Sequence, residues 1–176
     1  MKRWRLIPIL LALVAGNVLA LPDPVRAGRA DWREWGSGEM TWFGFALYRA
    51  TLWVSGQDDG VLREGVPLAL ALEYRRDIPG ERIVRASVDE MRKLGATEAQ
   101  LQGWEAEMRR VFPDVKKGDV LTGVLLPGQG ARFFHQNRLL GDVTDAAFAR
   151  TFFAIWLDPK TSAPDVRLAL LRLKAD

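Results

Sequence analysis

Hydrophobic and polar residues alternate along two stretches of this chain in the manner of a half-buried β-strand. The even-numbered positions of residues 46–54 are all apolar, and the even-numbered positions of residues 68–74 are three leucines and a tyrosine. Successive side chains of a strand point to opposite faces of a sheet, so each stretch predicts a strand with one buried face. Between them, residues 57–60 (QDDG) predict a turn.

The middle of the chain changes to a helical period. From about residue 80 to residue 94, apolar positions recur at i, i+4 and i+7, which predicts an amphipathic helix. Residues 97–100 (TEAQ) have the spacing of a capping box, in which the threonine hydroxyl and the glutamine side chain satisfy backbone groups of the first turn. The helix that they open keeps an apolar face until Phe112, and Pro113 ends it.

Strand patterns return in the second half of the chain. Residues 119–126, 131–136 and 139–143 are separated by short turn sequences and predict an antiparallel meander. Thr144 is expected to cap a further helix with an aromatic buried stripe, and residues 162–164 (SAP) open a last one. Strands, helices, strands and helices therefore follow one another in blocks. This order predicts an α+β domain with helices layered on one face of an antiparallel sheet.

The N-terminal part of the chain has no such period. Residues 1–20 combine a basic start, a short apolar run and a small-residue end, which predicts an export signal cleaved after Ala20 and a periplasmic or secreted protein. Its apolar run falls short of the roughly 20 residues that span a bilayer, so we expect no stable membrane span after cleavage. An uncleaved anchor is the alternative. Residues 21–37 are expected to be an irregular lead-in, and residues 38–176 the domain.

Composition removes several function classes. The chain has 25 Lys and Arg residues against 22 Asp and Glu residues, and three of the basic ones lie in the predicted signal, so the remainder is balanced. Without a net basic surface we expect no nucleic-acid partner. The chain has no cysteine and one histidine, His135, which excludes thiol chemistry and argues against a transition-metal site. We therefore expect no metal and no cofactor.

Motifs for catalysis are also missing. The glycines between residues 118 and 130 lack a following Gly-Lys-Ser/Thr and predict a hairpin turn rather than a phosphate-binding loop. Residues 36–38 (GSG) lack the nucleophile-elbow pattern, and a serine triad would need His135 near a hairpin end. We expect no catalytic residue of these classes.

Two features remain as candidates for binding. Residues 73–77 (EYRRD) close a strand that is otherwise aliphatic. They form either a solvated, paired strand end or an anchor for a carboxylate, which a guanidinium binds with two hydrogen bonds. The chain is also rich in aromatic residues, most of which we assign to the core and a minority to a cleft.

A series of segments resembles the bacterial chalcone isomerase-like family. The first, residues 44–54 (GFALYRATLWV), is similar to the glycine, aromatic and "Tyr-x-Ala-x-Leu-Tyr/Trp-Val" strand of that family. The others follow in family order and are residues 72–78 (LEYRRDI), 117–121 (KGDVL), 127–137 (PGQGARFFHQN), 141–149 (GDVTDAAFA) and 155–171. The resemblance implies an open-faced sandwich, an antiparallel sheet with helices on one side and a cleft between them.

The same resemblance argues against the family's enzymatic activity. Chalcone isomerases use an arginine early in the first hairpin, but residues 39–42 read EMTW and no arginine lies between Arg33 and Arg49. Tyr48 falls at or near the position of a threonine, the helix of residues 97–112 lacks the expected tyrosine and asparagine, and the late hydroxyl position falls near Ala154. Loss of the arginine removes the cation that would stabilise an anionic intermediate.

Three functions follow from this comparison. The preferred one is a non-catalytic binder of a fatty-acid-like or other apolar small molecule, since non-enzymatic relatives in this fold bind fatty acids. The second is an interaction or assembly protein with a filled cleft, in which Trp32, Trp35 or an exposed strand face contacts a partner. The third is an isomerase or lyase with a rearranged site. The sequence leaves the oligomeric state open. The candidate ligand-binding residues are Trp42, Tyr48, Tyr74, Arg75, Arg76, Phe152 and Trp156.

Overall fold

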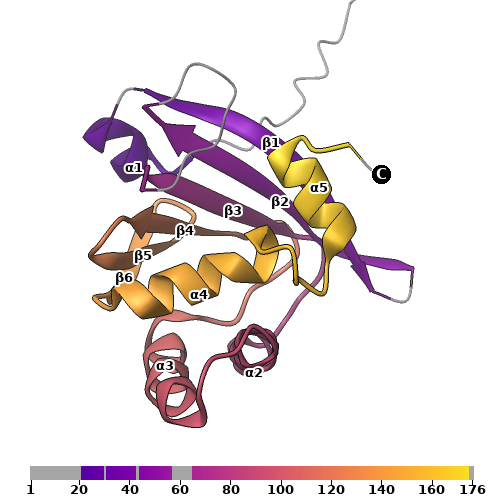
Figure 1. Cartoon of the computed structure of the whole chain (residues 1–176). Coiled ribbons are helices and arrows are strands. Elements are labelled where there is room, and N and C mark those ends of the chain that lie inside the picture. The colour runs from indigo at the N-terminus through magenta and orange to yellow at the C-terminus, as the bar shows by residue number, and fades with distance from the viewer. Residues whose placement is uncertain (1–20, 30, 43, 57–64, 175–176) are drawn as a thin grey trace, which may run out of the picture.

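An antiparallel sheet forms the centre of the molecule. The computed structural model describes residues 21–29, 31–42, 44–56 and 65–174. In this part of the chain six strands pair in the order in which they occur in the sequence (Figure 1). They are β1 (Trp32–Trp42), β2 (Phe45–Ser55), β3 (Leu68–Tyr74), β4 (Val120–Leu126), β5 (Gly130–His135) and β6 (Arg138–Val143). The predicted antiparallel sheet and the second-half meander are confirmed.

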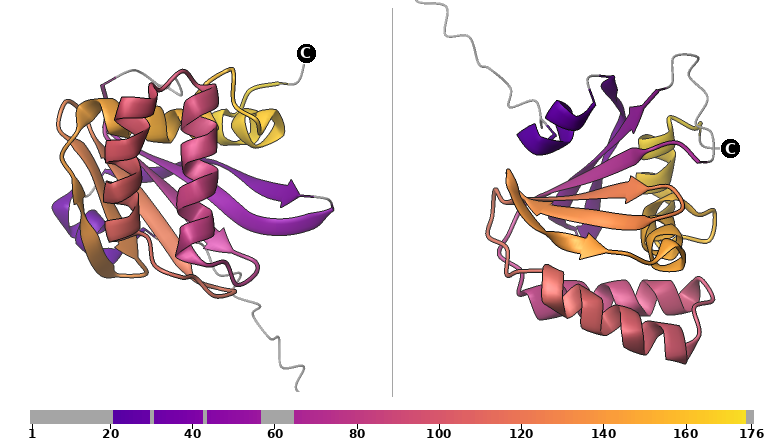
Figure 2. Two further views of the ribbon diagram at one scale, coloured as in Figure 1. Left: turned by 90° about the horizontal axis from the view of Figure 1, so that it is seen from below. Right: turned by 90° about the vertical axis from the view of Figure 1, so that its left-hand side faces the viewer.

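Helices cover mainly one face of this sheet. They are α1 (Asp23–Gly28), α2 (Gly80–Lys93), α3 (Glu98–Val111), α4 (Ala146–Leu157) and α5 (Pro164–Leu171). Helix α5 lies on β1 and β2, α4 lies on β4 and β5, and α2 packs against α3 and α4 (Figure 2). The α+β class is confirmed. The predicted layer of helices on one face of the sheet is confirmed, and α1, which the sequence did not predict, packs on the other face.

Alternation along β2 and β3 buries the predicted residues. Ala50, Leu52 and Val54 are fully buried, and they share the helix-covered core with Leu70 and Leu72 of β3. The other face of β3 is buried as well, because Ala69 on that face belongs to a second apolar cluster with Leu21 and Val25. The apolar, even-numbered positions of the two strands therefore identify the face of the sheet on which the helices pack.

The segment of residues 21–37 is not an irregular lead-in, as the sequence suggested. It contains α1, which begins with a proline in its first turn, and the first half of β1. The glycines that hide the strand period have a structural cause. A Cβ atom on Gly36 would lie 2.4 Å from the carbonyl oxygen of Leu170, because α5 packs directly on β1 at this point. Only a residue without a side chain permits that approach.

The opposite face of the sheet has a small apolar cluster of its own. Its buried members are Leu21, Val25, Ala69, Val124 and Phe134. Trp32 packs against this cluster and donates its indole N–H to the carbonyl oxygen of Val25 at 3.2 Å. Trp35 is buried in the main core. Both tryptophans that the assembly hypothesis offered as partner contacts thus have structural roles.

Helix ends follow the sequence signals with one correction. The capping box is present, since Thr97 Oγ1 accepts the backbone N–H of Gln100 and Gln100 Oε1 accepts the N–H of Thr97. Asp145, not Thr144, caps α4. Its carboxylate accepts the N–H groups of Ala147 and Phe148, and a carboxylate has more acceptor sites than a hydroxyl.

Two sequence predictions lie outside the described residues, namely the signal of residues 1–20 and the turn of residues 57–60. Within the described ranges, no helix has the length and apolar character needed to cross a membrane.

Candidate functional site

An aromatic cluster joins the sheet to α4 on the helix-covered face. Tyr48 of β2 and Tyr74 of β3 are cross-strand partners, and their ring centroids lie 5.8 Å apart in an edge-to-face arrangement. Trp156 of α4 donates its indole N–H to Tyr48 Oη at 3.0 Å. One turn earlier on the same helix, the Phe152 ring lies 5.4 Å from that of Trp156. We call these four residues the tyrosine–tryptophan site.

This site continues into the packed core. Phe152 contacts a group of buried rings from the C-terminal cap of α3, from β5 and from α4, which are Phe112, Phe133, Phe148 and Phe153. Phe152, Trp156 and Tyr74 are buried, whereas Tyr48 is partly exposed. Tyr48 is therefore the member of the site at the border of the core.

Burial controls the protonation of both phenols. Burial raises the pKa of Tyr48 to about 12, with a smaller upward contribution from the charge of Glu90, while the Trp156 N–H acts in the opposite direction. Burial also raises the pKa of Tyr74 well above its usual range. Both residues carry their protons at neutral pH. Because Tyr48 Oη accepts from Trp156, its own O–H is left to donate.

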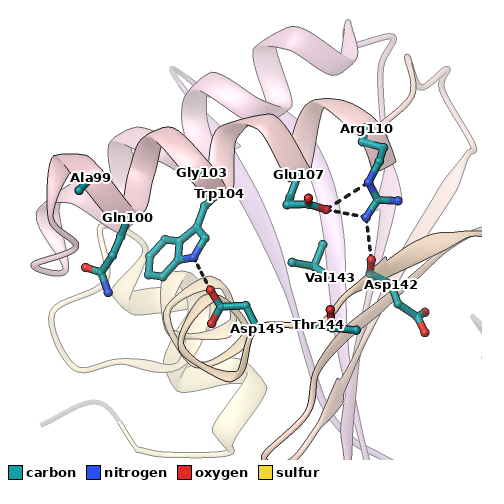
Figure 3. Close-up of a pocket in the computed structure, with 10 residues that line it drawn as sticks. All are labelled: Ala99, Gln100, Gly103, Trp104, Glu107, Arg110, Asp142, Val143, Thr144 and Asp145. Atoms are coloured by element: carbon teal, nitrogen blue, oxygen red, sulfur yellow. Dashed lines mark hydrogen bonds and ion pairs between the residues drawn. The ribbon is translucent and has the colours of Figure 1, made fainter.

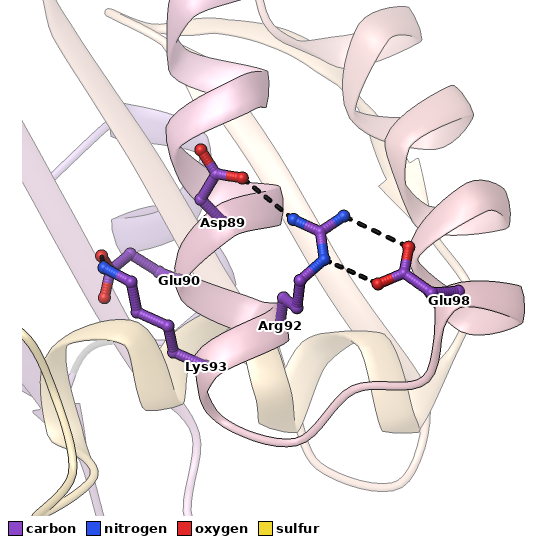
Figure 4. Close-up of polar contacts among 5 residues, drawn as sticks. All are labelled: Asp89, Glu90, Arg92, Lys93 and Glu98. Atoms are coloured by element: carbon purple, nitrogen blue, oxygen red, sulfur yellow. Dashed lines mark hydrogen bonds and ion pairs between the residues drawn. The ribbon is translucent and has the colours of Figure 1, made fainter.

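Glu90 belongs to a group of charges at the end of α2 (Figure 4). Its carboxylate lies 2.7 Å from Lys93 Nζ. Arg92 joins α2 to α3 through Glu98, at 2.6 Å, and also pairs with Asp89. The Arg92–Glu98 pair thus ties the two helices together, while Glu90 is paired within α2. No cation of the described residues acts on the Tyr48 phenol, whose pKa responds to burial, Trp156 and Glu90.

Comparison with known proteins assigns the chain to a family. The family model described as chalcone isomerase-like matches residues 15–172. The chain belongs to the chalcone isomerase-like family. Among solved structures it is similar to a fatty-acid-binding protein of Arabidopsis thaliana, with a TM-score of 0.59 and 13% sequence identity over 80% of this chain and 87% of that one. At that identity the likeness shows a common fold. No curated protein sequence matches this family member.

The family resemblance placed the catalytic arginine of chalcone isomerases within residues 39–42. In this family member these residues lie on β1, and Met40 is the cross-strand partner of Tyr48. A methionine therefore occupies the place beside the phenol. A protonated phenol with no adjacent cation is poorly suited to act as a base or to stabilise an enolate.

The structure brings together four of the seven residues that the sequence singled out. Trp42 lies at the end of β1 and is 62% exposed. Arg75 Nη1 lies 2.9 Å from Glu73, and its Nε lies 3.4 Å from Glu39. Arg76 lies over the ring of Phe45, 5.9 Å from its centroid. Since side chains alternate along a strand, Tyr74 points to the core and Arg75 away from it.

A separate groove, which the sequence did not indicate, lies between α3 and the junction of β6 with α4 (Figure 3). Its volume is about 550 Å³. Its polar groups bind one another: Trp104 Nε1 donates to Asp145 at 2.9 Å, and Arg110 bridges Glu107 and the carbonyl oxygen of Asp142. We assign this groove to the packing of α3, because its polar groups already have partners.

The tyrosine–tryptophan site makes a specific spectroscopic prediction. Tyr48 and Tyr74 are the only tyrosines of the chain, so tyrosinate absorbance reports this site alone. A free tyrosine ionises near pH 10, and we expect the folded protein to show no tyrosinate band until the pH approaches about 12. The two phenols ionise at a lower pH in the unfolded chain than in the folded protein. Their contribution to the stability of the fold is therefore complete below about pH 10 and is lost as the pH rises through the folded pKa of Tyr48, about 12.

The measurement is an alkaline absorbance titration with circular dichroism recorded on the same samples. Tyr74→Phe leaves Tyr48 as the only tyrosine, so the titration curve of this variant reports the ionisation of the partly exposed Tyr48 alone. Ionisation of a tyrosine near pH 10 with an unchanged circular dichroism spectrum would contradict the buried arrangement.

Proposed function

We propose that this chalcone isomerase-like protein is a non-catalytic binder of an acyl chain or a similarly apolar small molecule. The observation that carries the proposal is the Tyr48 phenol, which stays protonated, is oriented by Trp156 and has its O–H free to donate at the border of an aromatic core. Ligand pockets are mostly apolar with a few placed polar groups, and this site has that composition. The fold shared with a fatty-acid-binding protein supports the same ligand class.

The charges around Tyr48 favour a ligand with an uncharged oxygen head group. The partly buried Glu90 raises the pKa of the phenol, so it would also repel a carboxylate. Arg75, the cation next to Tyr74 in the chain, is paired with Glu73 and Glu39. The head group is therefore an ester, an alcohol or a protonated acid, which accepts one hydrogen bond from Tyr48.

Met40 provides the adaptable wall of this site. It is the cross-strand partner of Tyr48, and it is partly buried against the core. An unbranched thioether changes rotamer at low cost, so it can move aside for an apolar chain. The buried rings around Phe152 are closely packed, so the ligand lies along the border formed by Met40 and Tyr48 rather than inside the core.

Mass spectrometry tests the proposal directly. The protein is purified from its own cells without detergent and measured under native conditions. An added mass that disappears on denaturation and matches an acyl compound supports the binder. A clean apo mass together with a discrete larger assembly favours the interaction protein with a filled cleft, an alternative that the packed rings around Phe152 support.

Binding of palmitic acid and its methyl ester then tests the head group. Tyr48→Phe removes the donor O–H and keeps the ring, and we expect the ester to bind about fivefold more weakly, as for one lost hydrogen bond of about 1 kcal/mol. Arg75→Gln is the matched control and should leave ester binding unchanged. Loss of binding in Arg75→Gln alone would overturn the assignment of Tyr48 as the anchor.

We also propose that the protein is exported to the periplasm or secreted. Support comes from the sequence of residues 1–20, which has the basic start, apolar run and small-residue end of a signal. N-terminal sequencing of the protein from its own cells should begin at Leu21. A first residue before Ala20 would support the anchor instead.

A further inference from the structure

The β1–β2 hairpin continues past the rest of the sheet (Figure 1 and Figure 2). Strand β3 pairs with β2 only as far as Tyr48, which faces Tyr74. Beyond that point the two strands pair with each other, from Met40 to the last pair, Trp42 with Phe45. Gly44 adopts a φ of 78° in the turn, a conformation that suits glycine. The end of the hairpin is thus a narrow projection.

Two large aromatic side chains lie side by side at this end. Trp42 is 62% exposed and Phe45 is 65% exposed. As directly opposed partners of an antiparallel pair, they project from the same face of the hairpin. The cost of holding these rings in water suggests that another phase or surface receives them.

One arginine shares this surface. The Arg76 guanidinium lies 5.9 Å from the centroid of the Phe45 ring. Arg49 lies on the opposite face of the hairpin, because the register of β1 and β2 shifts between Met40 and Thr41. No carboxylate of the described residues forms an ion pair with Arg76, whereas the nearby Arg75 is paired with Glu73 and Glu39. Trp42, Phe45 and Arg76 form what we call the aromatic tip.

The size and chemistry of the aromatic tip favour a lipid surface over a protein. Stable protein–protein interfaces bury about 1,200–2,000 Å² in total, and two rings at the end of a hairpin supply a small part of that. Tryptophan is enriched at the level of the lipid head groups, and arginine binds phosphate oxygens with two hydrogen bonds. We propose that the aromatic tip docks this protein on a membrane that contains anionic phospholipids, with Arg76 at the phosphates.

This docking goes beyond the proposed ligand binding and does not depend on it. The two are nevertheless adjacent, because Tyr48 follows Phe45 by three residues, about 10 Å along a strand. A protein docked by its tip would hold the Met40–Tyr48 border close to the lipid surface, from which an apolar ligand could enter.

Vesicle sedimentation of the full chain tests the docking. The probes are vesicles of phosphatidylcholine alone and of phosphatidylcholine mixed with phosphatidylglycerol. We expect sedimentation with the anionic vesicles, weakened by added salt. The variants are Trp42→Ala/Phe45→Ala, which should lower the partition coefficient on the order of tenfold or more, and Arg76→Gln, which should lower it about fivefold, as for one arginine worth about 1 kcal/mol near the surface. All variants are purified from their own cells and share one N-terminus, so any contribution of that segment is constant.

Leu139→Ala is the matched control, because Leu139 is also an exposed apolar residue, 53% accessible, on β6. It should sediment like the unchanged chain. Equal loss in the control, or no sedimentation of the unchanged chain, overturns the proposal, as does self-association through the tip in ultracentrifugation without vesicles. Unfolding curves confirm that the surface variants are folded. Binding of the methyl ester in solution should be unchanged in Trp42→Ala/Phe45→Ala, which separates failure of docking from failure of ligand binding.

Discussion

Replacement of Phe148 by alanine is expected to lower the free energy of unfolding by about 3–5 kcal/mol. Phe148 is fully buried on α4. Its ring lies within contact of rings from three elements, Trp104 of α3, Phe133 of β5 and Phe152 of α4 itself. Because these neighbours come from a sheet and two helices, they cannot close together over the missing ring, so a cavity remains.

Denaturant unfolding followed by circular dichroism measures this loss. Leu139→Ala is again a suitable control, since a half-exposed side chain should change stability by roughly 0.5 kcal/mol at most. A loss below about 1 kcal/mol in Phe148→Ala would mean that the ring cluster does not unfold together with the sheet.

The second large effect is expected for Gly36→Ala. A Cβ atom at this position would lie 2.4 Å from the carbonyl oxygen of Leu170 and 2.6 Å from that of Ala169. Both atoms belong to the backbone of α5, so no side-chain rotation can relieve the contact. Overpacking in cores costs about 1–3 kcal/mol and sometimes more. We expect about 3 kcal/mol, together with detachment of α5 from β1.

Hydrogen exchange of the α5 amides distinguishes detachment from a general loss of stability. Gly103→Ala is the control, a glycine-to-alanine change for which we expect a gain in stability instead of a loss. Gly103 lies in α3, and a Cβ there would meet no heavy atom within 4 Å. Alanine is the better helix former, so this variant should be more stable by about 0.5–1 kcal/mol. Wild-type stability and slow α5 exchange in Gly36→Ala would show that the close contact is absent.

Features that depend on neighbouring residues could be predicted from the sequence. The strand face predicted for residues 46–54 occurs from Tyr48 to Val54, since a bulge turns Ala46 to the other side, and the helix that begins at Gly80 and the capping box at residues 97–100 are also present. Each depends on interactions within a few residues, where side-chain spacing has a direct geometric meaning. Alternation likewise separated Tyr74 from Arg75 correctly.

Features that depend on distant residues could not be predicted in this way. Gly36 looks like a loop residue until α5 is placed against it. Trp42 and Trp156 are equally apolar in the sequence, yet one is exposed at a hairpin end and the other is buried beside Tyr48. The hydrogen-bond partner of Trp156, Tyr48, lies 108 residues away, so no local pattern shows that these two side chains meet.

The packing of α5 on β1 also has a consequence during synthesis. The ribosome completes β1 long before it reaches Pro164, where α5 begins. Until then the glycine surface around Gly36, on the edge strand of the sheet, has no cover from this helix. A nascent chain therefore cannot cover this face of its first strand until α5 has been made. Chains that terminate before α5 would expose this face, which makes them targets for chaperones and proteases.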